Sequence, residues 1–466
     1  MSEMAIAGIA GYVLVQFLIG VWVSRRVATE QDYILAGRSL GTGLVAFSVF
    51  ATWFGAEAIV ASAGEIYDKG LSGALTDPFG YGAAVVIVAL LLAAPLWRRG
   101  LTTYADLIAT RYSPAVEKAF VLVLLPGSVF WAGAQIRSFG QILGATTGIE
   151  VATAILIAAV LVGAYSVVGG LLADAVTDVV QGAAVILGLA LLVWFVLAET
   201  GGLSASLATL EPGRLSIVPA GESGVFLLFE KLAVVICGSI VSVELISRFL
   251  GASSVRVART GTLIGGLMYL AVGLAPFYLG LVGPGLIKDL AEPEQIVPRL
   301  AGTYLPAYVY PFFIGAQISA ILSVVHAALH APAAQISHNV INPALPQLSA
   351  RARLVSVRTA VLVLSVVATV LALRFKSIKE LVETASAFGS AGAFIVALFA
   401  LFSRFGGPVA ALATLASGIL VWLCGKYLIG VETPYLVSVA AALVVYVSVG
   451  VLESTQKTAS REPGTS

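Results

Sequence analysis

The sequence predicts an all-α integral membrane protein that crosses the bilayer many times. Hydrophobic residues occupy 59% of the 466 positions, whereas charged residues occupy only 11%. Apolar runs of about 20 residues, the length that a helix needs to cross a bilayer core of about 30 Å, follow one another along the chain. Most of the charges lie in the short gaps between these runs. This pattern is typical of a polytopic membrane protein.

We expect about thirteen transmembrane helices, since each long apolar run can cross the bilayer once. They form a single transmembrane domain over residues 1–453, followed by a short, polar tail at 454–466 that we expect to be disordered. The predicted helices span 3–24, 40–66, 77–98, 117–147, 151–169, 174–199, 224–247, 258–285, 308–342, 355–373, 380–403, 408–428 and 433–453.

The flanking charges predict the orientation in the membrane. The first run begins with Glu3 instead of a basic stretch and is followed by Arg25 and Arg26, which is the pattern of a retained helix and not of a cleaved signal peptide. When the N-terminus is placed outside, most lysines and arginines fall in loops on one side, and the positive-inside rule makes that side cytoplasmic. We therefore expect a protein of the cell (inner) membrane with its N-terminus outside and its C-terminal tail in the cytoplasm.

The composition excludes several classes of function. A net charge of +1 without a basic cluster gives no indication of nucleic-acid binding. The longest polar stretches, near 200–222 and 286–307, are too short for a soluble domain, and the chain has no Gly-rich phosphate loop. No nucleophile, acid and metal ligands cluster on one membrane side, so we expect neither an enzyme nor an organic cofactor. An ion gradient is then the energy source for any active transport.

Polar residues interrupt the run 40–66. Gly55 and Glu57 lie in its middle, between Phe54 and Ala58. A charged side chain inside a membrane span costs several kcal/mol, about 3 kcal/mol at the centre of a helix, and glycine weakens a helix further. We expect an unwound segment that lines a cavity. The alternative is a continuous helix in which Glu57 pairs with a neighbour.

A polar stripe marks the run 174–199. Asp174, Thr177, Asp178 and Gln181 are spaced by three, one and three residues, so they share one helical face that must contact protein or water. Asp174 has a simpler interpretation as a negative charge at the cytoplasmic interface, where it interacts favourably with the positive N-terminal end of the helix dipole. Asp178, one turn deeper, is the better candidate for a functional carboxylate.

All three histidines lie in the run 308–342. At about 100° per residue, the serines and two of the histidines fall within a face roughly 60° wide. This polar face predicts the wall of an aqueous or ion-binding cavity. The two histidines on it could form structural hydrogen bonds or handle protons. They could also hold a metal, although no obvious third ligand accompanies them. We expect His338, off this face, to extend toward the cytoplasm. The residues of the face are Ser319, Ser323, His326, His330 and Ser337.

Two further charged pairs need partners. Glu230 and Lys231 are adjacent, so their side chains point about 100° apart on a helix and must find separate partners. Glu244 is expected to pair with Arg248 one turn later, which is a structural role.

A family resemblance rests on the residues 165–181. Gly169-Gly170, followed by Thr177-Asp178-Val179-Val180-Gln181, resembles the signature of the sodium/solute symporter family. The likeness covers nearly the whole chain, with further support from the segments 35–38, 248–250 and 320–323. It implies a secondary active transporter of the leucine-transporter type with a core at 40–403, in which 40–199 and 224–403 are two inverted five-helix repeats, while 3–24 and 408–453 add extra helices. The first helix of each repeat is expected to break at mid-membrane, near Glu57 and at Cys237-Gly238-Ser239.

The resemblance also implies a sodium site between the broken first helix and the eighth helix of the core. Its ligands match the carbonyls of Ala51, Phe54 and Ala320 and the hydroxyl of Ser323, and an oxygen cage suits a hard cation. Val324 stands where the family has a second hydroxyl, which weakens the expected site.

A second ion site in some family members matches Asp178, Ser323, His326 and Ala327. His326 replaces a hydroxyl there and is expected to approach Asp178. Sodium is therefore the expected coupling ion, and a proton held by His326 and Asp178 is the alternative.

The solute site resembles the choline-transporter branch of the family. Trp53, Tyr81 and Trp131 match aromatic positions that hold a cationic amine, with Glu57 or Asp77 as the counter-charge. No aromatic residue occurs at 239–243, where that branch has one. The expectation is symport of a small organic solute with a cation by alternating access, and a cationic or zwitterionic amine is the solute class that these residues suggest. A facilitator or a transporter-like sensor is the competing interpretation.

Overall fold

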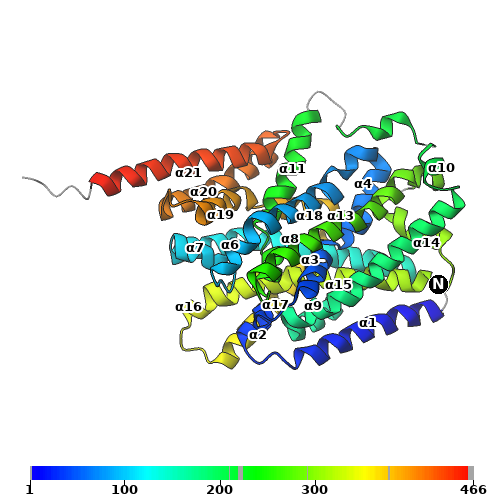
Figure 1. The fold of residues 1–466 in the computed structure, drawn as a ribbon, viewed down its shortest axis with the longest axis horizontal. Coiled ribbons are helices and arrows are strands. Elements are labelled where there is room, and N and C mark those ends of the chain that lie inside the picture. Colours follow the sequence, from blue (N-terminus) through cyan, green and yellow to red (C-terminus); the bar gives the residue numbers. More distant parts are fainter. Residues whose placement is uncertain (1–2, 209, 219–223, 291, 376–377, 460–466) are drawn as a thin grey trace, which may run out of the picture.

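The computed structural model describes residues 3–208, 210–218, 224–290, 292–375 and 378–459 (Figure 1). These residues form helices and connecting turns, and no strand occurs among them. Ten of the helices are long and apolar enough to cross a membrane. An all-helical integral membrane protein is thus confirmed, whereas the thirteen spans and the inverted repeats stay predictions.

The α-helices have the following bounds: α1 (Glu3–Ser24), α2 (Glu30–Leu35), α3 (Thr42–Trp53), α4 (Ser62–Lys69), α5 (Tyr81–Ile87), α6 (Ala93–Arg98), α7 (Ala105–Arg111), α8 (Pro114–Thr147), α9 (Val151–Glu199), α10 (Leu203–Ala208), α11 (Gly224–Ile240), α12 (Val243–Leu250), α13 (Val255–Leu286), α14 (Ile296–Tyr304), α15 (Tyr310–Gln335), α16 (Asn342–Ala344), α17 (Ala350–Arg374), α18 (Ile378–Ala387), α19 (Ser390–Phe402), α20 (Pro408–Leu423) and α21 (Pro434–Ala459). Short π-helical turns continue several of them, among them η2 (Glu57–Ala61), η4 (Leu75–Gly80) and η8 (Ile336–Ile341).

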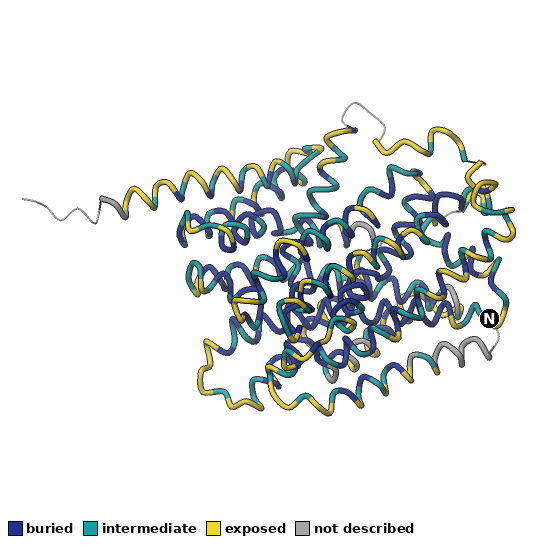
Figure 2. Tube along the Cα trace, in the orientation of Figure 1, coloured by how far each residue is buried: buried dark blue, intermediate teal, exposed yellow. Residues whose placement is uncertain are grey.

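Helix α15 is the centre of the molecule. In its most apolar stretch 94% of the residues are buried, against 28% in the corresponding stretch of α21. It packs against α8, α9 and α17, and Figure 2 shows the buried segments gathered around it. The most deeply buried helix is therefore the one that carries the polar face.

Peripheral helices lie on two sides of this core (Figure 1). Helix α1 packs against α9 and α15, whereas α19, α20 and α21 pack against one another. Helix α21 continues to Ala459, so the first part of the predicted disordered tail is helical. Residues 460–466 lie outside the described residues.

The predicted break in the run 40–66 is present. Helix α3 ends at Trp53, and Phe54 leaves the helix with ψ 64° before the chain resumes at η2. The Gly55 amide donates to the Trp53 carbonyl (3.0 Å), so the Ala51 carbonyl loses its usual helical donor. The Ala56 amide donates to Gln135 Oε1 (3.1 Å). Only glycine fits at position 55, because a Cβ there would lie 2.7 Å from Val324 Cγ2.

The break in the run 224–247 lies later than predicted. Helix α11 continues through Gly238 to Ile240, and α12 begins at Val243 with Ser242 as its N-cap. Gly238 instead permits close packing, since a Cβ there would lie 2.8 Å from the Ser386 carbonyl oxygen. The expected unwinding at Cys237-Gly238-Ser239 is therefore wrong.

Glycines with positive φ mark two more interruptions. Gly170 (φ 71°, ψ 171°) divides α9 at the Gly-Gly pair, where we placed the boundary between two predicted spans. Gly389 (φ 72°) separates α18 from α19, an interruption that we did not predict. Both positions favour glycine because L side chains rarely adopt this backbone conformation.

Candidate functional site

A cavity of about 80 Å³ lies where the breaks of the two interrupted helices meet α8, α13 and α18. Four of the five predicted solute-binding residues line it together, namely Trp53, Glu57, Tyr81 and Trp131. The structure places the fifth, Asp77, in a wider vestibule and not in the cavity. Four residues from segments far apart in the chain thus lie together, as the resemblance implied, and their role in solute binding stays a prediction.

Aromatic rings form one part of the cavity wall. The Trp53 and Trp131 rings meet edge to face with centroids 5.4 Å apart, and the Tyr81 hydroxyl lies 3.1 Å from Ser386 Oγ. Tyr269, which we did not predict, is also fully buried at the cavity. The electron-rich faces of such rings attract cations.

Carboxylates supply the charge of the cavity. Glu57 at the start of η2 lies near the Tyr81 hydroxyl and Trp131, and Glu244 in the first turn of α12 accepts a hydrogen bond from Ser242 Oγ (2.7 Å). Among the described residues that line the cavity, none is a lysine, arginine or histidine. The ionisable carboxyl groups of the cavity are accordingly not matched by a basic side chain among these residues.

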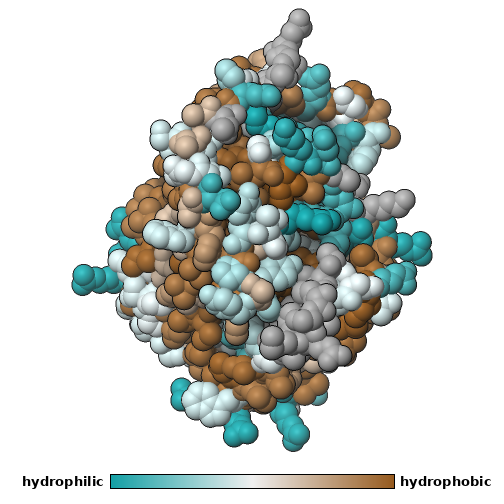
Figure 3. Space-filling model, turned by 90° about the vertical axis from the view of Figure 1, so that its right-hand side faces the viewer, coloured by the Kyte–Doolittle hydropathy of each residue, from teal (hydrophilic) through white to brown (hydrophobic). Residues whose placement is uncertain are grey.

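A vestibule of about 730 Å³ adjoins the cavity and shares Glu57, Tyr81 and Ser386 with it. It lies beside α4, the start of α11 and the loop before α14. Figure 3 looks onto the side that carries α10 and α14, where hydrophilic side chains gather in the upper part. Three lysines line the vestibule against nine carboxylates: Glu57, Glu65, Asp68, Asp77, Glu230, Glu292, Glu294, Glu383 and Glu432.

Two of these lysines are already paired. Lys69 and Lys231 both contact Glu65 Oε1, at 3.1 and 3.2 Å. Glu230 accepts hydrogen bonds from the Tyr435 and Leu436 amides at the start of α21 (2.7 and 2.8 Å). The prediction that Glu230 and Lys231 have separate partners is thus confirmed. The vestibule retains a surplus of negative charge.

The predicted cation-binding residues gather around the break of α3. Ser48 donates to Asp178 Oδ2 (2.7 Å), and Ser323 donates to Asp178 Oδ1. Ala51 and Phe54 end α3, and Ala320 lies one turn before Ser323 on α15, which packs against α3. The six predicted residues are each at most 3% exposed, namely Ala51, Phe54, Asp178, Ala320, Ser323 and His326. Ser48 was not singled out in the sequence, although it lies one turn before Ala51.

His326 does not have the predicted contact. Its Nδ1 lies 3.0 Å from Asp174 Oδ2, and Arg248 forms an ion pair with the same oxygen. We expected His326 to approach Asp178, but the polar stripe of α9 presents Asp174 to it instead. Asp174 is fully buried, so its interpretation as a charge at the membrane interface is wrong. The expected pairing of Glu244 with Arg248 is also wrong, because Arg248 pairs with Asp174.

A chain of polar contacts extends from this ion pair toward α2. The His326 and His330 rings stack with centroids 5.3 Å apart, and His330 Nε2 lies 2.9 Å from the Tyr33 carbonyl oxygen. Burial raises the pKa of the Tyr33 hydroxyl, which therefore stays protonated and donates to the Ser166 carbonyl (2.8 Å). Within the described part of the chain, no group of three or more histidine, cysteine or carboxylate side chains could hold a metal ion.

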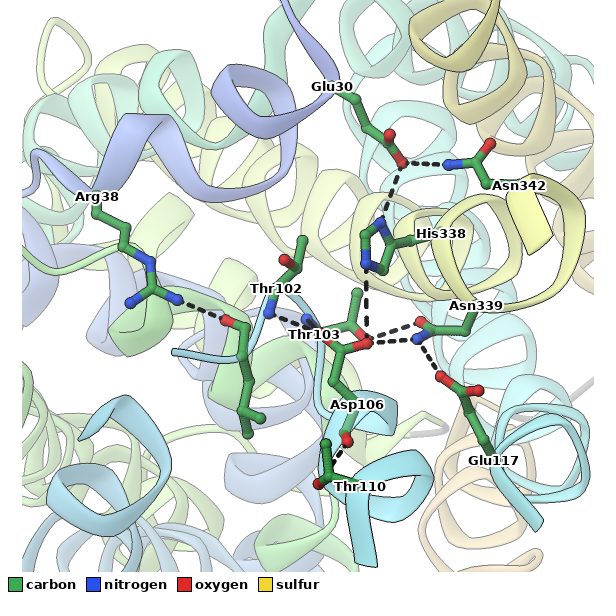
Figure 4. A network of polar contacts seen from close by, with 11 residues as sticks. Glu30, Arg38, Thr102, Thr103, Asp106, Thr110, Glu117, His338, Asn339 and Asn342 are labelled. Atoms are coloured by element: carbon green, nitrogen blue, oxygen red, sulfur yellow. Dashed lines mark hydrogen bonds and ion pairs between the residues drawn. The ribbon is translucent and has the colours of Figure 1, made fainter. Parts of the chain in front are cut away.

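A second polar network lies at the end of the molecule opposite α10 and α14 (Figure 4). His338 lies 3.4 Å from Glu30 Oε1 and 3.8 Å from Asp106 Oδ1. Asn339 Nδ2 donates to Asp106 and to Glu117, each at 2.6 Å. These contacts join α2, α7 and α8 to the end of the α15 segment. The vestibule and this network involve different residues, and they lie toward opposite ends of the helices.

Comparisons with known proteins found a matching family model and several relatives. The model of the sodium:solute symporter family matches residues 33–417. High-affinity choline transporter 1 of Homo sapiens is 25% identical over 447 residues, which cover 91% of this chain and 77% of that protein. The corresponding Drosophila melanogaster transporter is 26% identical, and the match covers 80% of this chain but only 63% of that transporter's length. The sodium/pantothenate symporter of Escherichia coli (strain K12) is 24% identical over 69% of each protein.

Solved structures share the fold. A Na+-coupled sialic acid symporter in a substrate-bound outward-open state superposes with a TM-score of 0.85 at 16% identity, covering 97% of this chain and 98% of the other. A nucleobase-cation-symport-1 family transporter in a closed conformation gives 0.62 at 13% identity, covering 91% and 95%. At these identities the likeness extends to the fold alone.

Proposed function

Since this chain belongs to the sodium:solute symporter family, we propose that it carries a small cationic or zwitterionic amine into the cell together with sodium, by alternating access. The observation that carries this proposal is the cavity, which combines Trp53, Tyr81 and Trp131 with two carboxylates and no basic side chain among its described lining residues. Cations bind favourably to aromatic faces and to carboxylates in such water-poor sites. The relatives are named for choline and for pantothenate, so the choice of an amine depends on the cavity and not on their names.

The vestibule supports the same choice. Its surplus of carboxylates attracts cations and repels anions before they reach the cavity. It opens at the end that we predict to face outward, and the polar network of Figure 4 closes the other end. The arrangement fits an outward-facing state that awaits a solute from outside.

Sodium is the proposed coupling ion. Asp178 and the hydroxyls of Ser48 and Ser323 lie beside the break of α3, where the Ala51 carbonyl has lost its helical donor. A carboxylate, hydroxyls and released carbonyls are oxygen ligands that suit a hard cation. The ion site and the solute cavity adjoin the same break of α3. A sodium ion bound at the ion site should therefore affect the shape of the solute cavity.

Transport in reconstituted vesicles tests the proposal. At least one of radiolabelled choline, butylamine and diaminobutane should accumulate above equilibrium when sodium is high outside, and not when potassium replaces sodium. Accumulation driven by a pH gradient without sodium, and lost in His326→Gln, would support the proton-coupled alternative instead. Equilibration without accumulation would indicate a facilitator, and absence of any amine transport would contradict the proposed solute class.

A further inference from the structure

The cavity contains one carboxylate more than a single cationic group needs. Glu57 follows the break of the first interrupted helix, whereas Glu244 follows the break of the second. Both line the same cavity, and Glu244 is only 4% exposed. Two carboxylates in a buried cavity are costly unless positive charge or hydrogen-bond donors compensate them.

The protein itself supplies little compensation for Glu244. Its natural partner one turn later, Arg248, is engaged in the ion pair with Asp174. Glu244 Oε2 accepts from Ser242, and the Ser128 hydroxyl lies near the carboxylate. Neutral hydroxyls satisfy hydrogen bonds but bring no positive charge to the carboxyl group. A positive group from outside the protein would complete the site.

Two further polar atoms at the cavity are buried and have no hydrogen-bond partner among the residues that the structure describes. They are Ser239 Oγ and Trp53 Nε1, in residues that are 3% and 8% exposed. Buried polar atoms in proteins are normally paired, so these atoms are suited to a ligand. Ser239 lies on the last turn of α11, close in sequence to Ser242 and Glu244. The Ser239 oxygen can accept a hydrogen bond from an N–H group, which a quaternary ammonium does not have, whereas Trp53 Nε1 can only donate and does not distinguish between these ligands.

We propose that the solute is a short dication with two basic nitrogens, of which at least one carries N–H donors, so that it is a diamine rather than a quaternary ammonium. One nitrogen lies among Trp53, Trp131 and Glu57. The other donates to Glu244 and to the hydroxyls of Ser239 and Ser242. The inference depends on the proposed transport of an amine and specifies its class. The surplus of carboxylates in the vestibule favours a dication over a monocation, because the attraction scales with charge.

Binding to the purified full-length protein tests the inference. Diaminobutane, butylamine and choline are titrated in sodium buffer by calorimetry, for the parent and for Glu244→Gln. A charge-assisted hydrogen bond contributes roughly tenfold to a hundredfold in affinity, so the parent should bind diaminobutane at least about tenfold more tightly than butylamine. Glu244→Gln should remove most of this advantage while it leaves butylamine affinity within about threefold, because the monoamine does not depend on Glu244.

Glu432→Gln is the matched control, because Glu432 is an exposed carboxylate of the vestibule that does not line the cavity. It should keep the preference for diaminobutane. Equal binding of diaminobutane and butylamine by the parent would contradict the proposal that the solute is a dication, but not the proposed transport of an amine. Equal weakening of both ligands by Glu244→Gln would contradict the same proposal. If none of the three amines binds, the proposed solute class itself fails.

Discussion

Ser48 on α3 and Ser323 on α15 donate hydrogen bonds to the two different oxygens of one carboxylate, that of Asp178 on α9. Three helices thus meet at a single buried charge. A hydroxyl that donates its proton to a carboxylate keeps its oxygen lone pairs available and becomes a stronger ligand for a cation. The two serines therefore hold Asp178 and keep oxygen lone pairs for the sodium ion that we propose to bind beside it.

Asp178→Asn should reduce the coupling of transport to sodium. The substitution keeps the shape of the side chain but removes the charge that balances the ion. We expect the sodium concentration for half-maximal uptake to rise by about tenfold or more, equivalent to about 1.4 kcal/mol. The measurement is amine uptake into vesicles as a function of sodium. Asp68→Asn, at an exposed carboxylate of the vestibule, is the control, and an unchanged sodium curve for Asp178→Asn would remove Asp178 from the ion site.

Ser48→Ala and Val324→Thr should shift the sodium dependence in opposite directions. Ser48→Ala removes a donor to Asp178, and the loss of about 1 kcal/mol predicts a severalfold weaker response to sodium. Val324 packs against Gly55 at the break of α3, and threonine has nearly the same shape, with a hydroxyl in place of one methyl group. Val324→Thr should therefore provide a further ligand and tighten sodium binding. If both variants retain the parent curve, the ion binds elsewhere.

The ion pair between Asp174 and Arg248 should behave as a unit. Both side chains are at most 1% exposed, so the removal of one partner leaves a buried charge and costs about 3 to 5 kcal/mol of stability. Asp174→Asn and Arg248→Gln should each lower the melting temperature of the purified protein. The double variant should be less destabilised than the sum of the two single effects. Additive effects would mean that the two charges do not depend on each other.

Local sequence features predicted the break of α3 and the kink of α9. Gly55 and Glu57 stand out in an apolar run, and Gly170 belongs to a Gly-Gly pair. Each departs from helical structure for a reason that resides in the residue itself, namely backbone freedom or an unpaired charge. The position of the second break was missed because Gly238 serves close packing against α18, which depends on the tertiary structure.

The partners of buried charges were harder to predict. Glu244 and Arg248 are one turn apart and would pair on an isolated helix, but Asp174 on α9 contacts Arg248 in the folded protein. His326 was expected at Asp178 because a family pattern aligns positions and does not record that this chain has a second aspartate one turn earlier. Both errors arise where contacts between helices override spacing along one helix.

We propose that the sodium site at Asp178 and the amine cavity are coupled through the break of α3. Linked equilibrium binding tests it most directly: the affinity of the purified protein for diaminobutane is measured with and without sodium, and the affinity for sodium with and without diaminobutane. Two coupled sites must change each other's affinity by the same factor, about fivefold or more for a typical coupling free energy. We expect equal enhancement in both directions for the parent protein and little enhancement for Asp178→Asn. An amine affinity that is the same in sodium and in potassium would contradict the account.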